Sequence, residues 1–436
     1  MKTNARKVIL DVLNQVDQGA YVSTLMQDIY KIEDLSELDR NFISKIVYGV
    51  LEQRIYLDYI VRHFSSVRLK KIEPEILNIL RMGAYQYLFL DKTPDSAVVN
   101  ESVKLAKKAS HRHSGFVNAL LRNMMRAEKD VPLPDLKNQP LEHYSVKYAH
   151  PQWMVERFFE LFGEAFAIEL MKANNEVPFL SLRVNTLYTN REDLMTKLEN
   201  MGISCRKSDK VEDGIVVEQG KQMMLLHNPL FKEGYFTIQD ESSMKVTEIL
   251  KPEQHDLILD LCAAPGGKTT HIAEKLQGTG KVVACDVSVK KIDIVKENLD
   301  RLRIKGVETL INDGTVLNQS FVNKFDKVLL DAPCSGLGII RRKPDIKINR
   351  QASDAKELQV IQLKLIEVAS EYVKAGGVLV YSTCTIDDLE NDQVIEKFLA
   401  EHSDFTVDEI QGQKSMKLYP NTHGTDGFYC CRLQKK

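Results

Sequence analysis

The sequence lacks the features that mark membrane, secreted and zinc-binding proteins. It has no apolar run approaching the roughly 18 residues of a membrane-spanning helix. Its basic start, MKTNARKVILDVL, has an apolar stretch interrupted by Asp11 and predicts a helix rather than a secretory leader. The seven cysteines form no C-x-x-C pair and stand near no histidine cluster, which argues against zinc and fits free thiols. We therefore expect a cytoplasmic chain with neither a metal nor a membrane span.

Two nucleotide-binding patterns are incomplete. The stretch DLCAAPGGKTT (260–270) ends like a phosphate loop, G-x-x-x-x-G-K-[ST], but Cys262 stands where that loop needs its first glycine. The spacing of Gly266 and Gly267 also fails the dinucleotide pattern G-x-G-x-x-G. An ATPase is thereby disfavoured, and a dinucleotide site has little support.

Hydrophobic residues of the first 130 positions recur with helical spacing and show no competing strand pattern. Val8, Ile9, Val12 and Val16 illustrate the i, i+3, i+4, i+7 rule. Residues 1–130 are therefore predicted to form an all-helical bundle. Four prolines fall within the next stretch, so residues 131–151 are predicted to be a linker.

The remaining chain alternates strands and helices. A helix over 155–171, a strand over 179–185, a helix near 191–201 and short strands near 214–218 and 235–239 predict a small α/β domain at 152–237. We expect this domain to position RNA. From residue 238 to 436 the regular strand–helix rhythm predicts an open parallel sheet of Rossmann-like type, covered on both faces. The chain is thus expected to hold three domains.

Polar and reactive residues follow every predicted strand of the last domain. In such a sheet ligands bind at the carboxyl ends of the strands, where the strand order reverses. The five strands are followed in turn by CAAPGGK (262–268), Asp286, Asp313, DAPCSG (331–336) and STCT (382–385).

These residues suit an adenosine-type ligand. Two adjacent glycines allow close approach to a ligand, although a tight turn explains them equally well. Asp286 suits a ribose diol and Asp313 an adenine amino group, with a helix cap or solvated loop as the alternative for each. Nothing in the pattern demands a pyrophosphate, so S-adenosylmethionine fits the set. The cofactor-binding residues predicted are Cys262, Ala263, Ala264, Pro265, Gly266, Gly267, Lys268, Asp286, Asp313 and Asp331.

Two cysteines stand in loops rather than in apolar runs. Cys334 follows Asp-Ala-Pro and precedes Ser-Gly, and Cys384 is flanked by serine and threonines. Most cysteines are small core residues. A thiol at a ligand-binding edge is instead a candidate nucleophile, and two thiols suggest covalent catalysis with separate attack and release.

DLCAAPGGKT, DAPCSG and YSTCT, in this order, resemble the Nop/Sun family of RNA cytosine-5 methyltransferases. The resemblance covers roughly residues 180–436 and includes RVNT (183–186) and QDESS (239–243). The helical part resembles the RNA-binding antitermination factor NusB, through residues such as GFVNALLR (115–122). This fusion resembles the branch of the family that methylates bacterial 16S ribosomal RNA.

The resemblance implies roles for the catalytic residues. Cys384 would attack C6 of cytosine, Cys334 would assist release of the product, and Asp331 would contact the cytosine edge or lie near the methyl donor. DNA cytosine-5 enzymes attack from a Pro-Cys loop instead, so the reverse order of the cysteines stays open. Lys268 would neutralise charge near cofactor or substrate. The family implies cytosine 967 of 16S rRNA, a position that no residue encodes.

Basic residues cluster in two places. Residues 101–130 hold seven basic and three acidic side chains. An RNA phosphate surface is predicted there, with a solvated helix face as the alternative. Basic residues after Cys334 suggest a second phosphate contact, with a charged loop as its alternative. The residues predicted are Lys104, Lys107, Lys108, Arg112, Arg122, Arg126 and Lys129 in the first cluster, and Arg341, Arg342, Lys343, Lys347 and Arg350 in the second.

The expected partner is 16S rRNA or a small-subunit assembly intermediate, and the chain is expected to be a monomer. Two other functions stay open. The same chemistry could act on tRNA, or the chain could be a non-catalytic RNA-binding assembly factor. The cysteine pair argues against the latter, because a binding module needs neither thiol.

Overall fold

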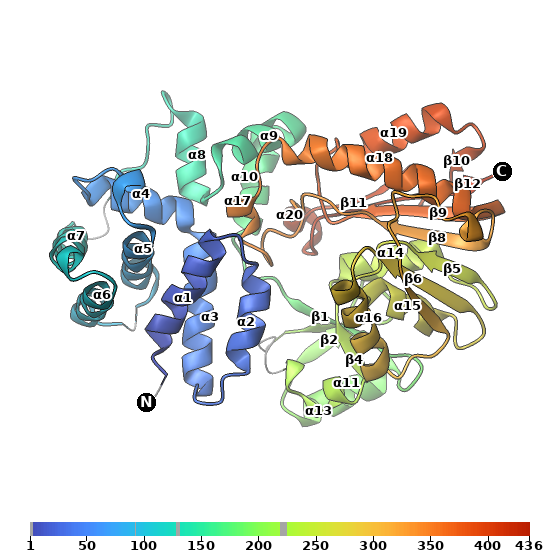
Figure 1. Cartoon of the computed structure of the whole chain (residues 1–436), viewed down its shortest axis with the longest axis horizontal. Coiled ribbons are helices and arrows are strands. Elements are labelled where there is room, and N and C mark those ends of the chain that lie inside the picture. The colour runs from blue at the N-terminus through green and yellow to red at the C-terminus, as the bar shows by residue number, and fades with distance from the viewer. Residues whose placement is uncertain (1–2, 92, 128–130, 219–224) are drawn as a thin grey trace. The chain divides into compact units, whose positions relative to one another are not determined.

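A computed structural model describes residues 3–91, 93–127, 131–218 and 225–436 of the chain (Figure 1). The chain divides into two compact units. The first consists of residues 1–176 together with 340–352, and the second of residues 177–339 and 353–436. No helix within the described ranges combines the length and the apolar character that crossing a membrane would require.

The first unit is helical, as the sequence predicts. Its core is made by apolar residues at helical spacing, including Ile9, Val12, Ile46 and Leu121. Asn4 caps the first helix by accepting hydrogen bonds from two backbone N–H groups. The helices are α1 (Ala5–Asp17), α2 (Val22–Tyr30), α3 (Glu37–Glu52), α4 (Arg54–Phe64), α5 (Pro74–Phe89), α6 (Asp95–Ala109), α7 (Ser114–Arg126), α8 (Pro140–Tyr148), α9 (Gln152–Phe162) and α10 (Glu164–Ala173), with one-turn helices at Leu69–Lys71 and His111–His113.

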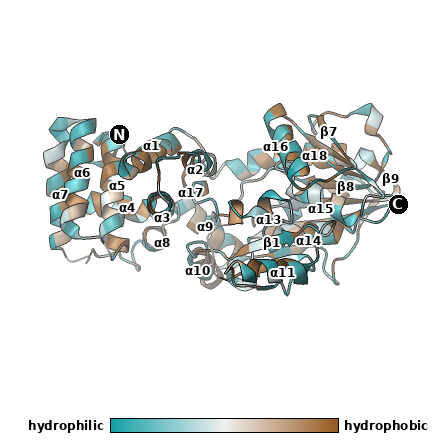
Figure 2. Cartoon of the chain, turned by 90° about the horizontal axis from the view of Figure 1, so that it is seen from below, coloured by the Kyte–Doolittle hydropathy of each residue, from teal (hydrophilic) through white to brown (hydrophobic). Residues whose placement is uncertain are grey.

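Helix α5 is the centre of this bundle. Almost every residue from Ile76 to Tyr87 is buried, and the helix packs against α1, α3, α4, α6 and α7. Figure 2 shows the contrast in hydropathy: α5 is mostly hydrophobic, whereas α6 and α7 carry alternating hydrophobic and hydrophilic residues. The outer helices therefore expose one polar face each.

The first unit extends further than the prediction. The proline-rich stretch 131–151 is no simple linker, since Pro140 opens α8, and α8 packs against α4 and α9. The single helix expected over 155–171 is two helices, because Gly163 has a φ of 75° and breaks it. Contacts group both helices, α9 and α10, with the helical unit, which ends at Glu176.

A short segment from the second half of the sequence completes the first unit. Within residues 340–352 lies α17 (Ile346–Asn349), and Ile348 packs against the helical core. Lys347 Nζ donates to Asn175 Oδ1 at 2.6 Å and to the carbonyl oxygen of Glu52 at 3.3 Å. Burial lowers the pKa of Lys347 to about 7. The segment is therefore part of the packed core of this unit and does not merely cover its surface.

The second unit begins with a small antiparallel sheet in the order β2-β3-β1-β4. The strands predicted near 179–185, 214–218 and 235–239 are confirmed, while the short strand β2 was not expected. The elements are β1 (Leu180–Val184), α11 (Arg191–Asn200), β2 (Cys205–Lys207), β3 (Gly214–Val217), α13 (Pro229–Lys232) and β4 (Phe236–Ile238).

A large sheet follows, in the order β10-β12-β9-β8-β5-β6-β7, with β11 paired to β12. Strands β9, β8, β5, β6 and β7 are parallel, as predicted, but β12 pairs antiparallel with β9, and β10 and β11 each pair antiparallel with β12. The sheet is therefore mixed rather than purely parallel. The strands are β5 (Leu257–Asp260), β6 (Lys281–Asp286), β7 (Val307–Ile311), β8 (Phe325–Asp331), β9 (Val373–Thr383), β10 (Phe405–Val407), β11 (Met416–Leu418) and β12 (Phe428–Lys435).

Alternating residues of the central strands supply two separate cores. Val328 and Leu330 face one core while Leu329 faces the other, because successive side chains of a strand point to opposite faces. The first core is closed by α18 (Asp354–Tyr372) and α19 (Asp392–Glu401), and the second by α14 (Glu241–Leu250) and α15 (Gly267–Lys275), with α16 (Val289–Arg301) beside them (Figure 1). The strand order reverses between β5 and β8, so the carboxyl ends of these strands form the expected binding edge.

Candidate functional site

The glycine loop joins β5 to α15 at this edge. Gly266 caps α15 with a φ of 98°, which favours glycine, and a Cβ there would stand 3.3 Å from Val295 Cα. Ala263 N donates to the carbonyl of Cys285 (2.8 Å), and Asn298 Nδ2 donates to the carbonyl of Pro265 (2.9 Å). Neighbouring strand and helix thus hold the loop in a fixed path. Cys262 lies within it, and burial raises the pKa of its thiol.

Asp286, at the end of β6, faces the glycine loop. Its Oδ2 accepts a hydrogen bond from Ala264 N (3.1 Å), and its Oδ1 accepts from Val287 N (2.7 Å) and pairs with Lys291 (3.0 Å). The predicted neighbourhood of loop and acid is therefore confirmed. Asp313 lies one strand further along and is exposed. Its Oδ1 accepts from the backbone and hydroxyl of Thr315, and the hydroxyl lowers the pKa of Asp313.

Two buried polar atoms at the edge have no hydrogen-bond partner among the described residues. They are Oδ1 of Asp260 and Nδ2 of Asn312. Burial raises the pKa of Asp260 to about 7, although Thr269 Oγ1 donates to its Oδ2 at 2.6 Å. Buried polar atoms usually have a hydrogen-bond partner, and at a binding edge these two offer one acceptor and one donor to a ligand. A compact polar ligand such as S-adenosylmethionine fits this glycine cradle, its acids and its unmet groups. Sequence reasoning passed over Asp260, although it ends a strand just as the others do.

The two candidate nucleophiles meet in space. Cys334 Sγ lies 3.2 Å from Cys384 Sγ, although 50 residues separate them. Both follow strands that are direct neighbours, β8 and β9, so the strand pairing brings them together. The hydrogen bond to Cys384, together with burial, raises the pKa of Cys334 well above its usual value. Cys334 therefore holds the proton that the two sulfur atoms share.

A charged group stands beside the thiols. Lys268 Nζ lies 2.6 Å from Asp331 Oδ2 and 4.9 Å from the centre of the Phe428 ring. Ser382 Oγ donates to the other carboxylate oxygen at 2.8 Å. Burial by itself would lower the pKa of Lys268, but Asp331 outweighs it, and the charge of Cys384 adds to the effect. The ammonium therefore stays charged and, by reciprocity, favours a thiolate at Cys384.

Buried Glu390 fixes both cysteine loops and was not anticipated from the sequence. Its carboxylate accepts from Ser335 N (2.9 Å) and from the Ser335 hydroxyl, and Gln362 Nε2 donates to it at 2.9 Å. Ser335 Oγ in turn lies 2.8 Å from Thr385 Oγ1. Because Glu390 stands six residues after Cys384 in an unremarkable acidic stretch, no local pattern marks it.

The other cysteines are core residues. Cys205, Cys285, Cys430 and Cys431 are buried. Burial raises the pKa of Cys205 to about 11 and that of Cys285 to about 12. These four thiols lie inside apolar cores, whereas Cys334 and Cys384 at the strand ends are only half-buried. No group of three or more His, Cys, Asp and Glu side chains in the described ranges is arranged for a metal ion.

The basic residues predicted to contact RNA divide into two groups. Those on α6, α7 and the turn between them are exposed: Lys104, Lys107, Lys108, Arg112, Arg122 and Arg126. Lys129 lies outside the described residues. In the second cluster Lys343 is exposed, but Arg341 and Lys347 are buried and Arg342 and Arg350 are half-buried, because residues 340–352 pack into the helical unit. The structure therefore offers Lys343 alone of that cluster as a fully exposed cation.

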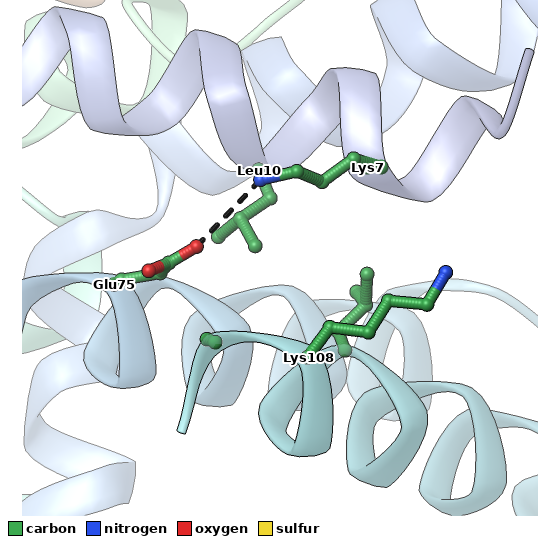
Figure 3. A pocket seen from close by; sticks show the side chains of 6 residues that line it. Lys7, Leu10, Glu75 and Lys108 are labelled. Atoms are coloured by element: carbon green, nitrogen blue, oxygen red, sulfur yellow. Dashed lines mark ion pairs between the residues drawn. The ribbon is translucent and has the colours of Figure 1, made fainter. Parts of the chain in front are cut away.

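A pocket of about 220 Å³ lies in the helical unit. Lys7 reaches across it toward Glu75 (3.7 Å), and Lys108 borders it from α6 (Figure 3). Lys7 also pairs with Asp11 at 2.7 Å. Its lining holds no thiol, so the pocket does not compete with the strand-end site for cysteine chemistry.

Three protein-family models match the chain. The NusB family matches residues 3–126, a ferredoxin-like domain of RsmF/B-like methyltransferases matches residues 150–224, and 16S rRNA methyltransferase RsmB/F matches residues 247–434. The three matches follow the order of helical bundle, small sheet and large sheet.

Individual relatives resemble the chain over its whole length. The probable ribosomal RNA small subunit methyltransferase B of Bacillus subtilis is 35% identical over 100% of this chain and 99% of the relative. The ribosomal RNA small subunit methyltransferase B of Proteus mirabilis is 34% identical over 100% of both chains. Among solved structures, NSun6 from Pyrococcus horikoshii with SFG has a TM-score of 0.61 and 26% identity over 66% of this chain and 99% of that chain.

Proposed function

Because the chain belongs to the family of ribosomal RNA small subunit methyltransferase B proteins, we propose that it methylates C5 of a cytosine in 16S rRNA. One observation carries the C5 chemistry: two thiols 3.2 Å apart beside a half-buried ammonium group, at the edge that holds the glycine loop. Methyl transfer to an amine or a hydroxyl needs no thiol, whereas cytosine C5 becomes nucleophilic only after a thiolate has added to C6.

Cys384 is the nucleophile in this proposal. Lys268 favours its thiolate, and Cys334 retains the shared proton. The Cys384 sulfur forms a bond with C6, and the electron pair of the C5–C6 double bond becomes available at C5. Bound S-adenosylmethionine supplies an electrophilic methyl group for that carbon.

Cys334 acts second. Its pKa is raised mainly by the hydrogen bond to Cys384, and that cause disappears once the Cys384 sulfur is bonded to carbon. Cys334 can then lose its proton to water and accept the proton of C5. As the C5–H bond breaks, the C5–C6 double bond re-forms and the Cys384 thiolate leaves. The net products are 5-methylcytosine, the demethylated donor and one proton.

Asp331 is proposed to hold the cytosine. One carboxylate oxygen faces Lys268 and the other Ser382, so the group is fixed in orientation. A carboxylate next to N3 and the amino group of cytosine would accept a hydrogen bond and stabilise the protonated form of N3, whose positive charge withdraws electrons from the ring. This eases attack at C6.

The residues that would hold S-adenosylmethionine are the glycine loop, Asp286 and Asp260. Asp286 lies at the end of the second strand, where a carboxylate suits a ribose diol. The unmet groups of Asp260 and Asn312 supply an acceptor and a donor. Asp313, exposed on the third strand end, remains the proposed contact for the adenine amino group.

The RNA partner is assigned from the family. A target cytosine must be unpaired or flipped out, at a cost of a few kcal/mol. The exposed lysines and arginines of α6 and α7 are proposed to bind phosphates. Cytosine 967 of 16S rRNA is the position that the family resemblance implies.

The test is to incubate the purified chain with labelled S-adenosylmethionine and, separately, with unmodified 16S rRNA, small-subunit particles and tRNA. Digestion and mass spectrometry then identify the nucleoside. We expect 5-methylcytidine in 16S rRNA, naked or in particles. Labelled tRNA alone would move the same chemistry to another substrate, and a methyl group on any other atom would overturn the cysteine mechanism. No transfer to any of them would favour a non-catalytic assembly factor.

A further inference from the structure

Arg183, on β1 of the small sheet, is completely buried and uses all five of its N–H donors. Nε and Nη2 donate to the two carboxylate oxygens of Glu274, each at 2.9 Å. The other Nη2 hydrogen reaches Thr270 Oγ1 at 2.8 Å. Nη1 donates to the carbonyl of Gly267 at 2.5 Å and to the side-chain carbonyl of Gln239. A lysine offers no such planar fork.

Most of these acceptors belong to α15, the helix that starts in the glycine loop. Gly267 and Thr270 form its first turn, and Glu274 follows one turn later. In that same first turn, Lys268 reaches Asp331 and Thr269 reaches Asp260, on the side of the candidate site. Arg183 thus bonds one side of the first turn of α15, while Lys268 and Thr269 of the same turn face the candidate site.

Asp213, just before β3 of the small sheet, bonds two further residues of α15. His271 Nε2 lies 3.3 Å from Asp213 Oδ2, and Lys275 Nζ lies 2.5 Å from the same oxygen. Gln239, just after β4, accepts from Arg183 and donates to Ser243 Oγ at 3.0 Å. Arg183 and Asp213 of the small sheet therefore bond α15 directly, and Gln239 supports Arg183 while it bonds α14.

These contacts assign a structural role to RVNT (183–186) and QDESS (239–243), to which the proposed function gives none. RVNT begins with Arg183 and QDESS begins with Gln239. Asn185 of the first stretch donates to the carbonyls of Gly234 (2.9 Å) and Leu302 (3.1 Å), and so fastens the small sheet to the end of α16. The sheet is thus tied on both sides of the glycine loop.

We propose that Arg183 is a positioning residue for the methyl donor: it sets the first turn of α15 and thereby the glycine loop that receives S-adenosylmethionine. The inference rests on the proposed function for the identity of that ligand. The small domain then serves cofactor binding, in addition to any contact with RNA.

The test compares Arg183→Lys with Arg301→Lys. Arg301 is the matched control, because it also ties the small sheet to the large one, donating to the carbonyls of Phe231 and Phe236 at 3.0 Å, but contacts no residue of the glycine loop. Calorimetry measures S-adenosylmethionine binding, a filter assay measures 16S rRNA binding without cofactor, and thermal unfolding reports stability. We expect the Kd for S-adenosylmethionine to rise about ten-fold in Arg183→Lys and to stay unchanged in Arg301→Lys. RNA binding should stay unchanged in both.

Thr270 provides a second test if Arg183→Lys does not fold. Thr270→Val removes, at nearly constant shape, the hydroxyl that accepts from Arg183 and itself donates to the Gly266 carbonyl (2.8 Å), and Thr270→Ser restores it. Weaker cofactor binding in the valine variant and normal binding in the serine variant support the inference. A Kd that is unchanged in Arg183→Lys or Thr270→Val, or equally raised in Arg301→Lys, overturns it. If the unaltered chain fails to bind S-adenosylmethionine, the proposed function falls and the inference falls with it.

Discussion

Gly338 N donates a hydrogen bond to the carbonyl oxygen of Cys384 at 3.0 Å, so main chain as well as sulfur joins the two cysteine loops. The carbonyl of Gly338 in turn accepts from Gly427 N at 2.8 Å. A Cβ on Gly338 would stand 2.1 Å from the Gly427 oxygen and 2.8 Å from the Cys384 oxygen. Both distances are too short for a real contact, so this position has room only for glycine.

Gly338→Ala should therefore displace the Cys384 loop. We expect methyl transfer to fall at least ten-fold and unfolding stability to fall by about 1–3 kcal/mol, the usual cost of overpacking. Methyl-transfer kinetics and thermal unfolding measure the two effects. Gly115→Ala is the control, because a Cβ at this position in α7 meets no described atom within 4 Å. Full activity in Gly338→Ala would contradict the close approach.

Substituting each cysteine separately should give opposite results. Cys384→Ala should abolish methylation and leave no covalent RNA complex, since the attacking sulfur is gone. Cys334→Ala should still attack but release product slowly, so that a protein–RNA adduct accumulates. Denaturing gels with labelled RNA distinguish the two. The reverse pattern would make Cys334 the nucleophile, as in DNA cytosine-5 enzymes.

Removing the ammonium of Lys268 should slow the chemical step. In Lys268→Met the Asp331 carboxylate loses its charged partner, and Cys384 loses the positive charge that favours its thiolate. We expect single-turnover methyl transfer to fall about 100-fold, a magnitude typical of removing one electrostatic interaction from an active site. Lys296→Met, at an exposed position on α16, serves as the control. An unchanged rate in Lys268→Met would exclude this role.

His271 should make the second unit sensitive to acid. Burial lowers its pKa to about 3, against about 6.5 in an unfolded chain, so the folded state holds it neutral. Below pH 6.5 the unfolded state binds the extra proton, and stability is lost as pH falls toward 3. Between pH 7 and pH 5 the loss is about 2 kcal/mol.

Urea unfolding of the full chain and of His271→Gln at both pH values measures this contribution. The neighbouring Asp213 has a pKa lowered to about 2, so it does not titrate within this window. The glutamine variant should therefore lose less stability between pH 7 and pH 5 than the unaltered chain. Equal losses in the two proteins would show that His271 is not the acid-sensitive group.

The exposed cations of α6 and α7 should control RNA affinity. We expect combined substitution of Lys104, Lys107, Lys108 and Arg122 by alanine to weaken 16S rRNA binding. The slope of log affinity against log salt should become shallower by about 0.7 for each phosphate of single-stranded RNA that the protein no longer neutralises. Lys290 and Lys296, exposed on α16, provide a control pair. An unchanged salt slope would remove this surface from the interface.

Strand-end chemistry was predictable because a parallel sheet fixes where its carboxyl ends lie. The meeting of Cys334 with Cys384, and of the glycine loop with Asp286, follows from strand order alone once the strands are assigned. Helical spacing identified the bundle for the same reason: a core face repeats with the turn of the helix. The sequence analysis did not predict strands β12, β10 and β11, because these strands do not alternate with helices as the parallel strands do.

Buried partners from distant positions were not predictable. Glu390 and Glu274 look like ordinary surface acids in the sequence, and only the fold shows that Ser335 and Arg183 satisfy their carboxylates. For Arg341 and Lys347 the error was the reverse: both were predicted to be exposed RNA contacts, and both are buried. A run of basic residues is usually exposed to solvent. Here residues 340–352 pack into the helical unit, and two of the basic side chains are buried with them.

Residues 340–352 have a practical consequence for dissecting the molecule. The chain leaves the second unit after Ile339, completes the first unit and returns at Ser353. No single cut can yield two whole parts: a fragment ending at Glu176 lacks α17 and Lys347, and a fragment starting at Val177 carries them without the core that they fill. The helical part is therefore discontinuous in sequence, and its last segment is synthesised only after most of the chain.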